Sequence, residues 1–394
     1  MSAPAAVEIH GDCHPQFTRV RDALAREFAQ GNELGASVCV TLEGETVVDL
    51  YAGFLDRART RPWRRDALAN VYSTTKGLTA LAAHRLVDEG LLDLDAPVAR
   101  YWPEFAQAGK QRISVRWLLS HQAGLPAVRR RLPPEALFEW ETMTAALAAQ
   151  EPWWEPGTRH GYHAVTFGWL VGEVVRRIRG RSLGEVVRDE IARPLGVDFE
   201  IGFGPELDAR VAPLVPGPAH APEGAAPDFD LASAIARDPE GMLAKAFANP
   251  PALDPALLHT RAWRAAELPA VNGHSNAHSL ARIYGALANG GAIGGVRLLS
   301  REAVERARTQ QVDGPDAVLP LRTRLALGFF LPTEDEPVGP NRRAFGHGGA
   351  GGSYSFADPD NRLSFGYVMN LMHTGLWLVD PRPRRLLAAA YACL

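Results

Sequence analysis

Residues 71–76 read Val-Tyr-Ser-Thr-Thr-Lys, a Ser-x-x-Lys pattern that opens a helix-forming run extending to Gly90. Positions i and i+3 of a helix lie on one face, so the Lys76 amine can reach the Ser73 hydroxyl. A serine at a helix start also has free backbone N–H groups and the positive end of the helix dipole nearby, which favour a developing oxyanion. The pattern predicts a nucleophile beside its base. Serine is also a common helix N-cap, so a purely structural role is the alternative.

Before and after this helix, the chain has patterns typical of strands, together with one terminal helix at each end. Residues 14–31 space apolar side chains as an amphipathic helix does, and residues 36–42 and 45–53 form two apolar runs typical of an antiparallel hairpin. Near the other end, three further runs are predicted as strands and one as a final helix: residues 325–332, 352–359, 362–370 and 383–394. The sheet is therefore expected to combine both ends of the chain.

The intervening chain has mostly helical patterns. The predicted helices cover residues 73–90, 114–120, 134–149, 166–180, 182–191 and 279–289. Residues 212–230 are rich in Pro, Ala and Gly without a period, which predicts an irregular loop. We expect an α/β plus α fold with an antiparallel sheet flanked by N- and C-terminal helices. The predicted units are a sheet domain (residues 1–80 and 265–394), an inserted helical domain (81–211) and a loop-rich segment near the site (212–264).

Further motifs follow Ser73-x-x-Lys76 along the chain. They are LVDEGLLDLDAPV at 86–98, LLSHQAGLP at 118–126, EPGTRHGY at 155–162 and FGHGGAGG at 345–352. In this order the motifs resemble the serine β-lactamase-like superfamily, specifically the class C β-lactamase and family VIII carboxylesterase branch. The resemblance spans roughly residues 15–200 and 270–370, and it implies the β-lactamase or penicillin-binding-protein fold.

The resemblance also implies three catalytic residues. The family's nucleophile falls on Ser73, its lysine on Lys76, and its catalytic tyrosine, which follows a Pro-Gly-Thr, on Tyr162. A phenol of ordinary pKa is a poor base at pH 7, but a cationic lysine beside it favours the phenolate, so the two groups can share a proton. Which of them takes the serine proton is left open.

The family's Lys-Thr-Gly motif is matched here by His347-Gly348-Gly349. By the resemblance, the backbone N–H of Ala350 pairs with that of Ser73 as an oxyanion hole. A glycine-rich turn without a catalytic role is the alternative. The asparagine two residues after the family's tyrosine is replaced by Ala164, and the strand lysine by His347. We therefore expect a carboxylesterase that cleaves small, short-chain esters through an acyl-enzyme, with at best weak β-lactamase activity.

Two other functional interpretations stay open at this stage. Residues 273–277 (Gly-His-Ser-Asn-Ala) approach the Gly-x-Ser-x-Gly elbow of α/β-hydrolases, which would make Ser275 the nucleophile, although Pro269 precedes them where a strand is needed. A non-catalytic relative that binds an acylating compound is the second. Trp154 is interpreted either as a wall of the acyl pocket or as core packing.

Composition excludes several classes of partner. The chain has 394 residues, with 42 Lys and Arg against 45 Asp and Glu, so no strong overall charge attracts nucleic acid or an anionic membrane. No apolar run approaches 18 residues, and the three cysteines are scattered. His160/His163 and His274/His278 have spacings that could hold zinc, but no Cys pair or His-Glu-x-x-His accompanies them. We therefore expect a cytoplasmic enzyme with no metal and no organic cofactor.

Overall fold

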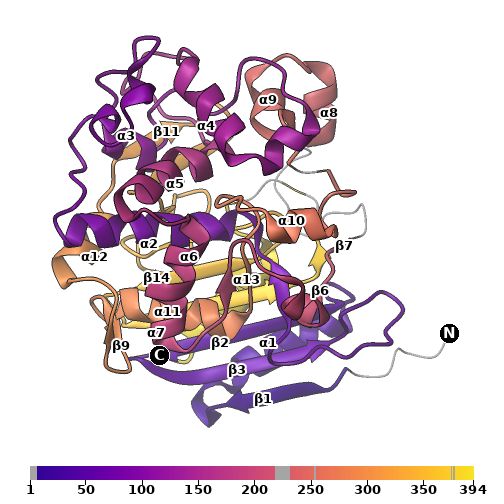
Figure 1. The fold of residues 1–394 in the computed structure, drawn as a ribbon. Helices are drawn as coiled ribbons and strands as arrows, with labels where there is room; N and C mark the ends of the chain where they lie inside the picture. Colours follow the sequence, from indigo (N-terminus) through magenta and orange to yellow (C-terminus); the bar gives the residue numbers. More distant parts are fainter. Residues whose placement is uncertain (1–6, 218–230, 253, 374, 376–377) are drawn as a thin grey trace.

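The computed structural model describes residues 7–217, 231–252, 254–373, 375 and 378–394 (Figure 1). Its main sheet has six strands in the order β1-β3-β2-β15-β14-β13, and every neighbouring pair is antiparallel. The strands are β1 (Ile9–Cys13), β2 (Gly35–Leu42), β3 (Glu45–Gly53), β13 (Phe345–Gly348), β14 (Tyr354–Asp358) and β15 (Leu363–Met369). Because β2 pairs with β15, the prediction that both ends of the chain build one antiparallel sheet is confirmed.

Both faces of the sheet are covered by helices. α1 (Thr18–Ala29) and α13 (Pro381–Tyr391) pack together on the face to which Val38 points, and α11 (Ala277–Ala288) covers the face of Cys39. This alternation follows from the two-residue period of a strand. Gly366 lets α11 approach, since a Cβ there would lie 2.3 Å from the Ala277 carbonyl oxygen. The predicted terminal helices and the helix near 279–289 are confirmed.

The helical part of the chain is built around α2 (Thr75–Asp88), which is buried from Thr75 to Ala83. A helix that is apolar on nearly all sides belongs in a core, and α2 contacts α5, α6 and β13. The other helices here are α3 (Val115–Leu119), α4 (Trp140–Ala149), α5 (Thr166–Arg179), α6 (Leu183–Val187) and α7 (Arg193–Leu195), with α12 (Arg301–Ala307) later in the chain. Figure 1 shows α3, α4 and α5 at the top and β1 at the bottom.

Some predicted elements differ in detail. The predicted helix 134–149 is a 3₁₀ turn (Pro134–Phe138) followed by α4, because Glu139 between them has an extended backbone. The strand predicted at 325–332 is wrong: β12 (Arg322–Leu325) ends there and the chain turns. Gly328 has φ +85°, and its N–H donates to the Leu119 carbonyl. The apolar residues of this run therefore form a buried turn and not a strand.

The expectation of an irregular segment at 212–264 is wrong in part. It contains the short strand β7 (Val215–Pro216) and the helices α8 (Leu231–Arg237) and α9 (Met242–Ala248), and α10 (Arg261–Ala265) begins within it. Residues 218–230, most of the predicted Pro-rich loop, lie outside the described residues. The proposed domain boundaries stay a prediction.

Short strands complete the fold. A four-stranded sheet has the order β5-β8-β4-β6. Its members are β4 (Leu68–Asn70), β5 (Phe199–Glu200), β6 (Val211–Ala212) and β8 (His274–Ser275). The two-stranded pairs are β7 with β16 (Leu371–Met372), β9 (Ala292–Ile293) with β10 (Val296–Arg297), and β11 (Val312–Pro315) with β12. Among the described residues, no helix combines the length and the apolar character that a membrane span requires.

Candidate active site

Ser73 lies in a single 3₁₀ turn, Tyr72–Thr74, between β4 and α2. Tyr72 has φ +43°, a left-handed conformation that costs energy in a residue with a Cβ and often marks functional sites. Hydrogen bonds of Thr75 fix the turn, since its hydroxyl donates to the Tyr72 carbonyl and accepts the N–H of Gly273. Ser73 itself is half-buried, while the residues on both sides of it are buried. The serine hydroxyl is therefore presented on a rigid support.

Lys76 is fully buried and reaches the serine. Its Nζ lies 3.0 Å from the Ser73 Oγ and 3.0 Å from the carbonyl oxygen of Ala270. Burial holds the pKa of Lys76 well below its ordinary value, because a charged amine is poorly solvated there. Burial therefore favours the neutral amine, which is the form that can accept a proton.

Tyr162 packs on Lys76, whose Nζ is 4.8 Å from the centre of the phenol ring. Burial raises the pKa of Tyr162, and its hydrogen bond with Ser73 opposes that effect only in part. The expectation that a cationic Lys76 would favour the phenolate is wrong, since burial disfavours both charges. Burial thus favours the neutral form of both groups that flank the serine.

The ring of Tyr162 is surrounded by other rings. The ring centres of His121, Phe330 and His347 lie 5.2, 5.6 and 6.2 Å from it. His347 is 2% exposed, its Nδ1 donates to the Gly348 carbonyl, and burial together with Lys76 lowers its pKa to about 3. The position matched to the family's strand lysine therefore carries no positive charge at neutral pH.

The glycine-rich loop after β13 contacts the turn before Ser73. A Cβ on Gly349 would lie 2.1 Å from the Val71 carbonyl oxygen, so only glycine fits there. The Ser353 hydroxyl donates to the same oxygen (2.8 Å), and the Thr74 hydroxyl donates to the His347 carbonyl (3.3 Å). These contacts attach the loop of Gly348, Gly349 and the exposed Ala350 to the turn that carries Ser73.

Trp154 lies one layer away from these groups. It is 8% exposed, and its ring stands perpendicular to that of His163 with 6.0 Å between the ring centres. His163 is itself structural: its Nε2 accepts the Leu125 N–H and its Nδ1 donates to the Gly161 carbonyl. Trp154 thus packs on the residue that follows Tyr162 and supports the loop that carries the tyrosine.

Two contributors to the site were missed by sequence reasoning. The Ala270 carbonyl binds Lys76 through its backbone, which no side-chain pattern reveals. The Asp316 carboxylate accepts the N–H of Tyr162 at 2.9 Å across 154 sequence positions, and no local signal marks such a contact.

The alternative nucleophile is occupied elsewhere. Ser275 is fully buried and its hydroxyl donates to the Asp198 carbonyl at 2.7 Å. The histidines considered for zinc also have other partners: His160 bonds Thr323, and the Nδ1 of His274 bonds the Asn272 carbonyl. Neither His160 with His163 nor His274 with His278 thus forms a metal site.

Within the described part of the chain, one group places three metal-ligand types together: Cys39, Asp49 and His278. Its carboxylate is already paired, since Asp49 Oδ2 lies 2.5 Å from Arg65 Nη2 and 3.1 Å from His278 Nδ1. A metal ion would have to displace this guanidinium. The cluster is better described as an ion-pair network that attaches Arg65 to the sheet.

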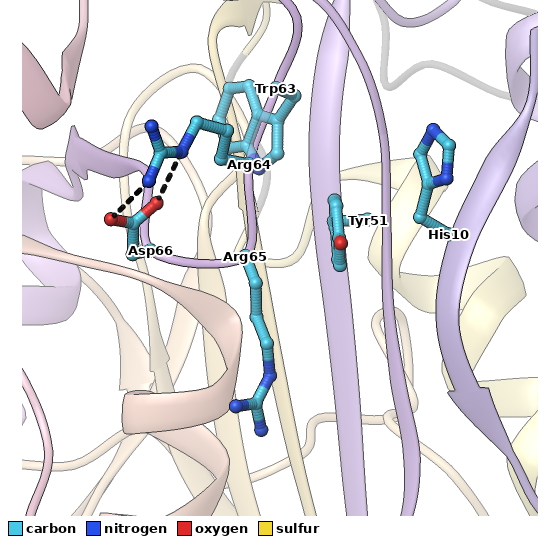
Figure 2. A pocket seen from close by; sticks show the side chains of 6 residues that line it. All are labelled: His10, Tyr51, Trp63, Arg64, Arg65 and Asp66. Carbon is cyan, nitrogen blue, oxygen red and sulfur yellow. Dashed lines mark hydrogen bonds and ion pairs between the residues drawn. The ribbon is translucent and has the colours of Figure 1, made fainter.

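An open hollow of about 450 Å³ adjoins this network at Arg65, and Ser73 is not among its lining residues (Figure 2). It is lined by His10, Tyr51, Trp63, Arg64, Arg65 and Asp66. Figure 2 shows Arg64 bonded to Asp66, and Arg65 pointing away from them. Because Arg64 pairs with Asp66 and Arg65 with Asp49, neither arginine offers an unpaired cation in this hollow.

Comparison with known proteins agrees with this geometry. The beta-lactamase family profile matches residues 20–389, so the chain belongs to the beta-lactamase family. It is 36% identical to the esterase/beta-lactamase LipL of Mycobacterium tuberculosis, over 95% of this chain and 86% of that protein.

Two solved structures share the fold. A family VIII carboxylesterase superposes with a TM-score of 0.90 at 46% identity, covering 98% of this chain and all of the other. A penicillin-binding protein homologue from Caulobacter crescentus superposes with a TM-score of 0.88 at 41% identity, covering 98% of this chain and all of the other. The predicted family and fold are thereby confirmed.

Proposed function

We propose that this protein is a serine hydrolase that cleaves small carboxylic esters through an acyl-enzyme on Ser73. The observation that carries the proposal is the fully buried Lys76, whose Nζ lies 3.0 Å from the Ser73 Oγ. The names of the relatives, an esterase/beta-lactamase and a family VIII carboxylesterase, support the same reaction class. The non-catalytic alternative gives no role to the buried lysine beside this serine.

In the proposed reaction, the Ser73 oxygen attacks the ester carbonyl carbon while its proton passes to Lys76 Nζ. The carbonyl oxygen becomes an oxyanion, for which the N–H groups of Ser73 and Ala350 are the proposed donors. As the oxyanion re-forms the carbonyl, the ester C–O bond breaks, and the protonated Tyr162 gives its proton to the leaving alkoxide and regains one from Lys76. Water then attacks the acyl carbon and gives one proton to Lys76, the bond between that carbon and Ser73 Oγ breaks, and the proton returns to Ser73 as the carboxylic acid leaves.

The preferred substrate is an uncharged ester. A substrate carboxylate would need a cation at the strand position, but His347 is buried and neutral there. The Ala164 side chain cannot bond a substrate amide. Losing a hydrogen bond to a charged group costs about 1.5–3 kcal/mol, roughly 10–150-fold in rate. β-Lactam turnover is therefore proposed to be slow beside ester turnover.

The test uses p-nitrophenyl butyrate with Ser73→Ala and its matched control Ser275→Ala. We expect Ser73→Ala to remove hydrolysis and Ser275→Ala to retain it in the folded fraction. Mass spectrometry after a fluorophosphonate probe should locate the label on Ser73. A label on Ser275, or activity that survives Ser73→Ala, contradicts the assignment. A kcat/KM for nitrocefin equal to that for the ester would contradict the substrate class.

A further inference from the structure

Asp316 holds the loop that carries Tyr162. It lies between β11 and β12, and its Oδ1 accepts the backbone N–H groups of Tyr162, Val318 and Leu319, each at 2.9 Å. Its Oδ2 accepts the hydroxyl of Thr323 at 3.0 Å. One carboxylate thus connects the tyrosine to a turn that is far away in the sequence.

A second set of contacts joins the same two segments. The His160 carbonyl accepts the N–H of Ala317 at 3.0 Å, and His160 Nε2 lies 2.9 Å from the Thr323 hydroxyl. The segments also touch at Gly161, where a Cβ would lie 3.0 Å from the side chain of Ala317. The tyrosine loop is therefore attached on both sides of Gly161, with Asp316 binding the residue that bears the phenol.

We propose that Asp316 is a positioning residue that holds Tyr162 against Ser73 and keeps a negative charge beside the phenol. This inference rests on the proposed function, because it assigns a task to Tyr162. In this scheme the side chain of Asp316 does not touch the reacting atoms. It acts through the backbone N–H of Tyr162 and through its charge.

The charge of Asp316 has a predictable sign. Together with burial, it raises the pKa of Tyr162, and so favours the protonated phenol that the leaving alkoxide requires. The titratable groups facing the phenol from other elements are Lys76 on α2, His121 after α3 and His347 on β13. Burial lowers the pKa of all three, which holds His121 and His347 uncharged near neutral pH, and Asp316 is the group whose negative charge raises the pKa of Tyr162.

The experiment compares Asp316→Ala, Asp316→Asn and the control Asp313→Asn. Asp313 lies on β11, bonds Arg322, and has no contact with Tyr162 among those described. In Asp316→Asn the amide oxygen still accepts the three N–H groups, but the charge is gone. The alkaline side of its pH profile of kcat/KM for p-nitrophenyl butyrate should move to lower pH, because the pKa of Tyr162 falls when the negative charge that raises it is removed.

Asp316→Ala removes the acceptor itself, and we expect kcat to fall about 10²-fold, as a small misplacement of a catalytic group does. Asp313→Asn should match the wild type in both readouts. A profile for Asp316→Asn that coincides with that of Asp313→Asn overturns the inference, as does an unchanged kcat in folded Asp316→Ala. If Asp316→Ala does not fold, the pH profile of Asp316→Asn decides. An inactive wild type would instead refute the proposed function.

Discussion

Lys76 and Tyr162 show how one physical cause, burial, assigns two opposite roles. Burial lowers the pKa of the amine and raises that of the phenol, so it favours the neutral form of both groups beside Ser73. An amine in that form can accept the serine proton, and a phenol can donate one. This division requires the two groups to be close, and Lys76 Nζ lies 4.8 Å from the centre of the Tyr162 ring. Among the described residues, the amine bonds the Ser73 hydroxyl and the Ala270 carbonyl, and no counter-ion contacts it.

We predict that Lys76→Ala and Tyr162→Phe each lower kcat by roughly 10²–10⁴, the usual contribution of a positioned acid–base group. The double variant should lose much less than the product of the two single losses, because the residues act as one proton path. The check is kcat for p-nitrophenyl butyrate with each variant, with thermal unfolding as a control for folding. Fully multiplicative losses would mean that the two residues act independently.

At the scale of elements, α13 supports the glycine-rich loop through one buried arginine. Arg382, in the first turn of α13, is fully buried and bonds the carboxylates of Asp380 and Glu33 and the carbonyl of Gly351. Gly351 belongs to the loop that brings Ala350 to the serine. The last helix of the chain is thereby connected to the proposed oxyanion hole.

Arg382→Met should lower the free energy of unfolding by about 3–5 kcal/mol, because it leaves two buried carboxylates without their cation. It should also lower kcat, since the Gly351 carbonyl loses the Arg382 donor and keeps only the backbone N–H of His373. The matched control is Arg384→Met on the same helix: Arg384 is partly exposed and pairs with Glu336, so about 1 kcal/mol or less is expected. Denaturant unfolding compares the two, and equal losses would contradict this role for Arg382.

For the molecule as a whole, the proposed chemistry uses groups from four separated parts of the chain. Ser73 and Lys76 come from the start of α2, Tyr162 from the loop before α5, Ala350 from the loop after β13, and Asp316 from the turn after β11. Pairing of β2 with β15 joins the two ends of the chain in one sheet, and the hydrogen bond from the Tyr162 N–H to Asp316 joins two of these parts directly. None of these groups is a proposed metal ligand.

We predict that a strong chelator changes neither kcat nor the melting temperature. The three potential ligands Cys39, Asp49 and His278 form the metal-ligand group of the described residues, and Arg65 already pairs with that carboxylate. The measurement is ester hydrolysis and thermal unfolding before and after dialysis against EDTA. A loss of activity that zinc restores would refute it, and Cys39→Ser would then show whether this cluster holds the ion.

Much of the fold could be predicted because it rests on local periodicity. The β2–β3 hairpin, α2, α5 and α13 follow from apolar spacing and from residues such as Gly180, whose left-handed backbone ends α5. The run at 325–332 misled this reasoning. It is apolar because it is buried, and periodicity cannot distinguish a buried turn from a buried strand.

By itself, the sequence determined the sheet shared by the two chain ends, the helical insertion, and the Ser73–Lys76 pair, whose contact needs only one helical turn. The tertiary structure alone decided which protonation states are favoured. Burial by distant segments favours the neutral forms of Lys76, Tyr162 and His347, and the bond between Asp316 and Tyr162 joins residues that no local rule relates. Desolvation is a property of the whole packed molecule, and for that reason it leaves no mark in a short stretch of sequence.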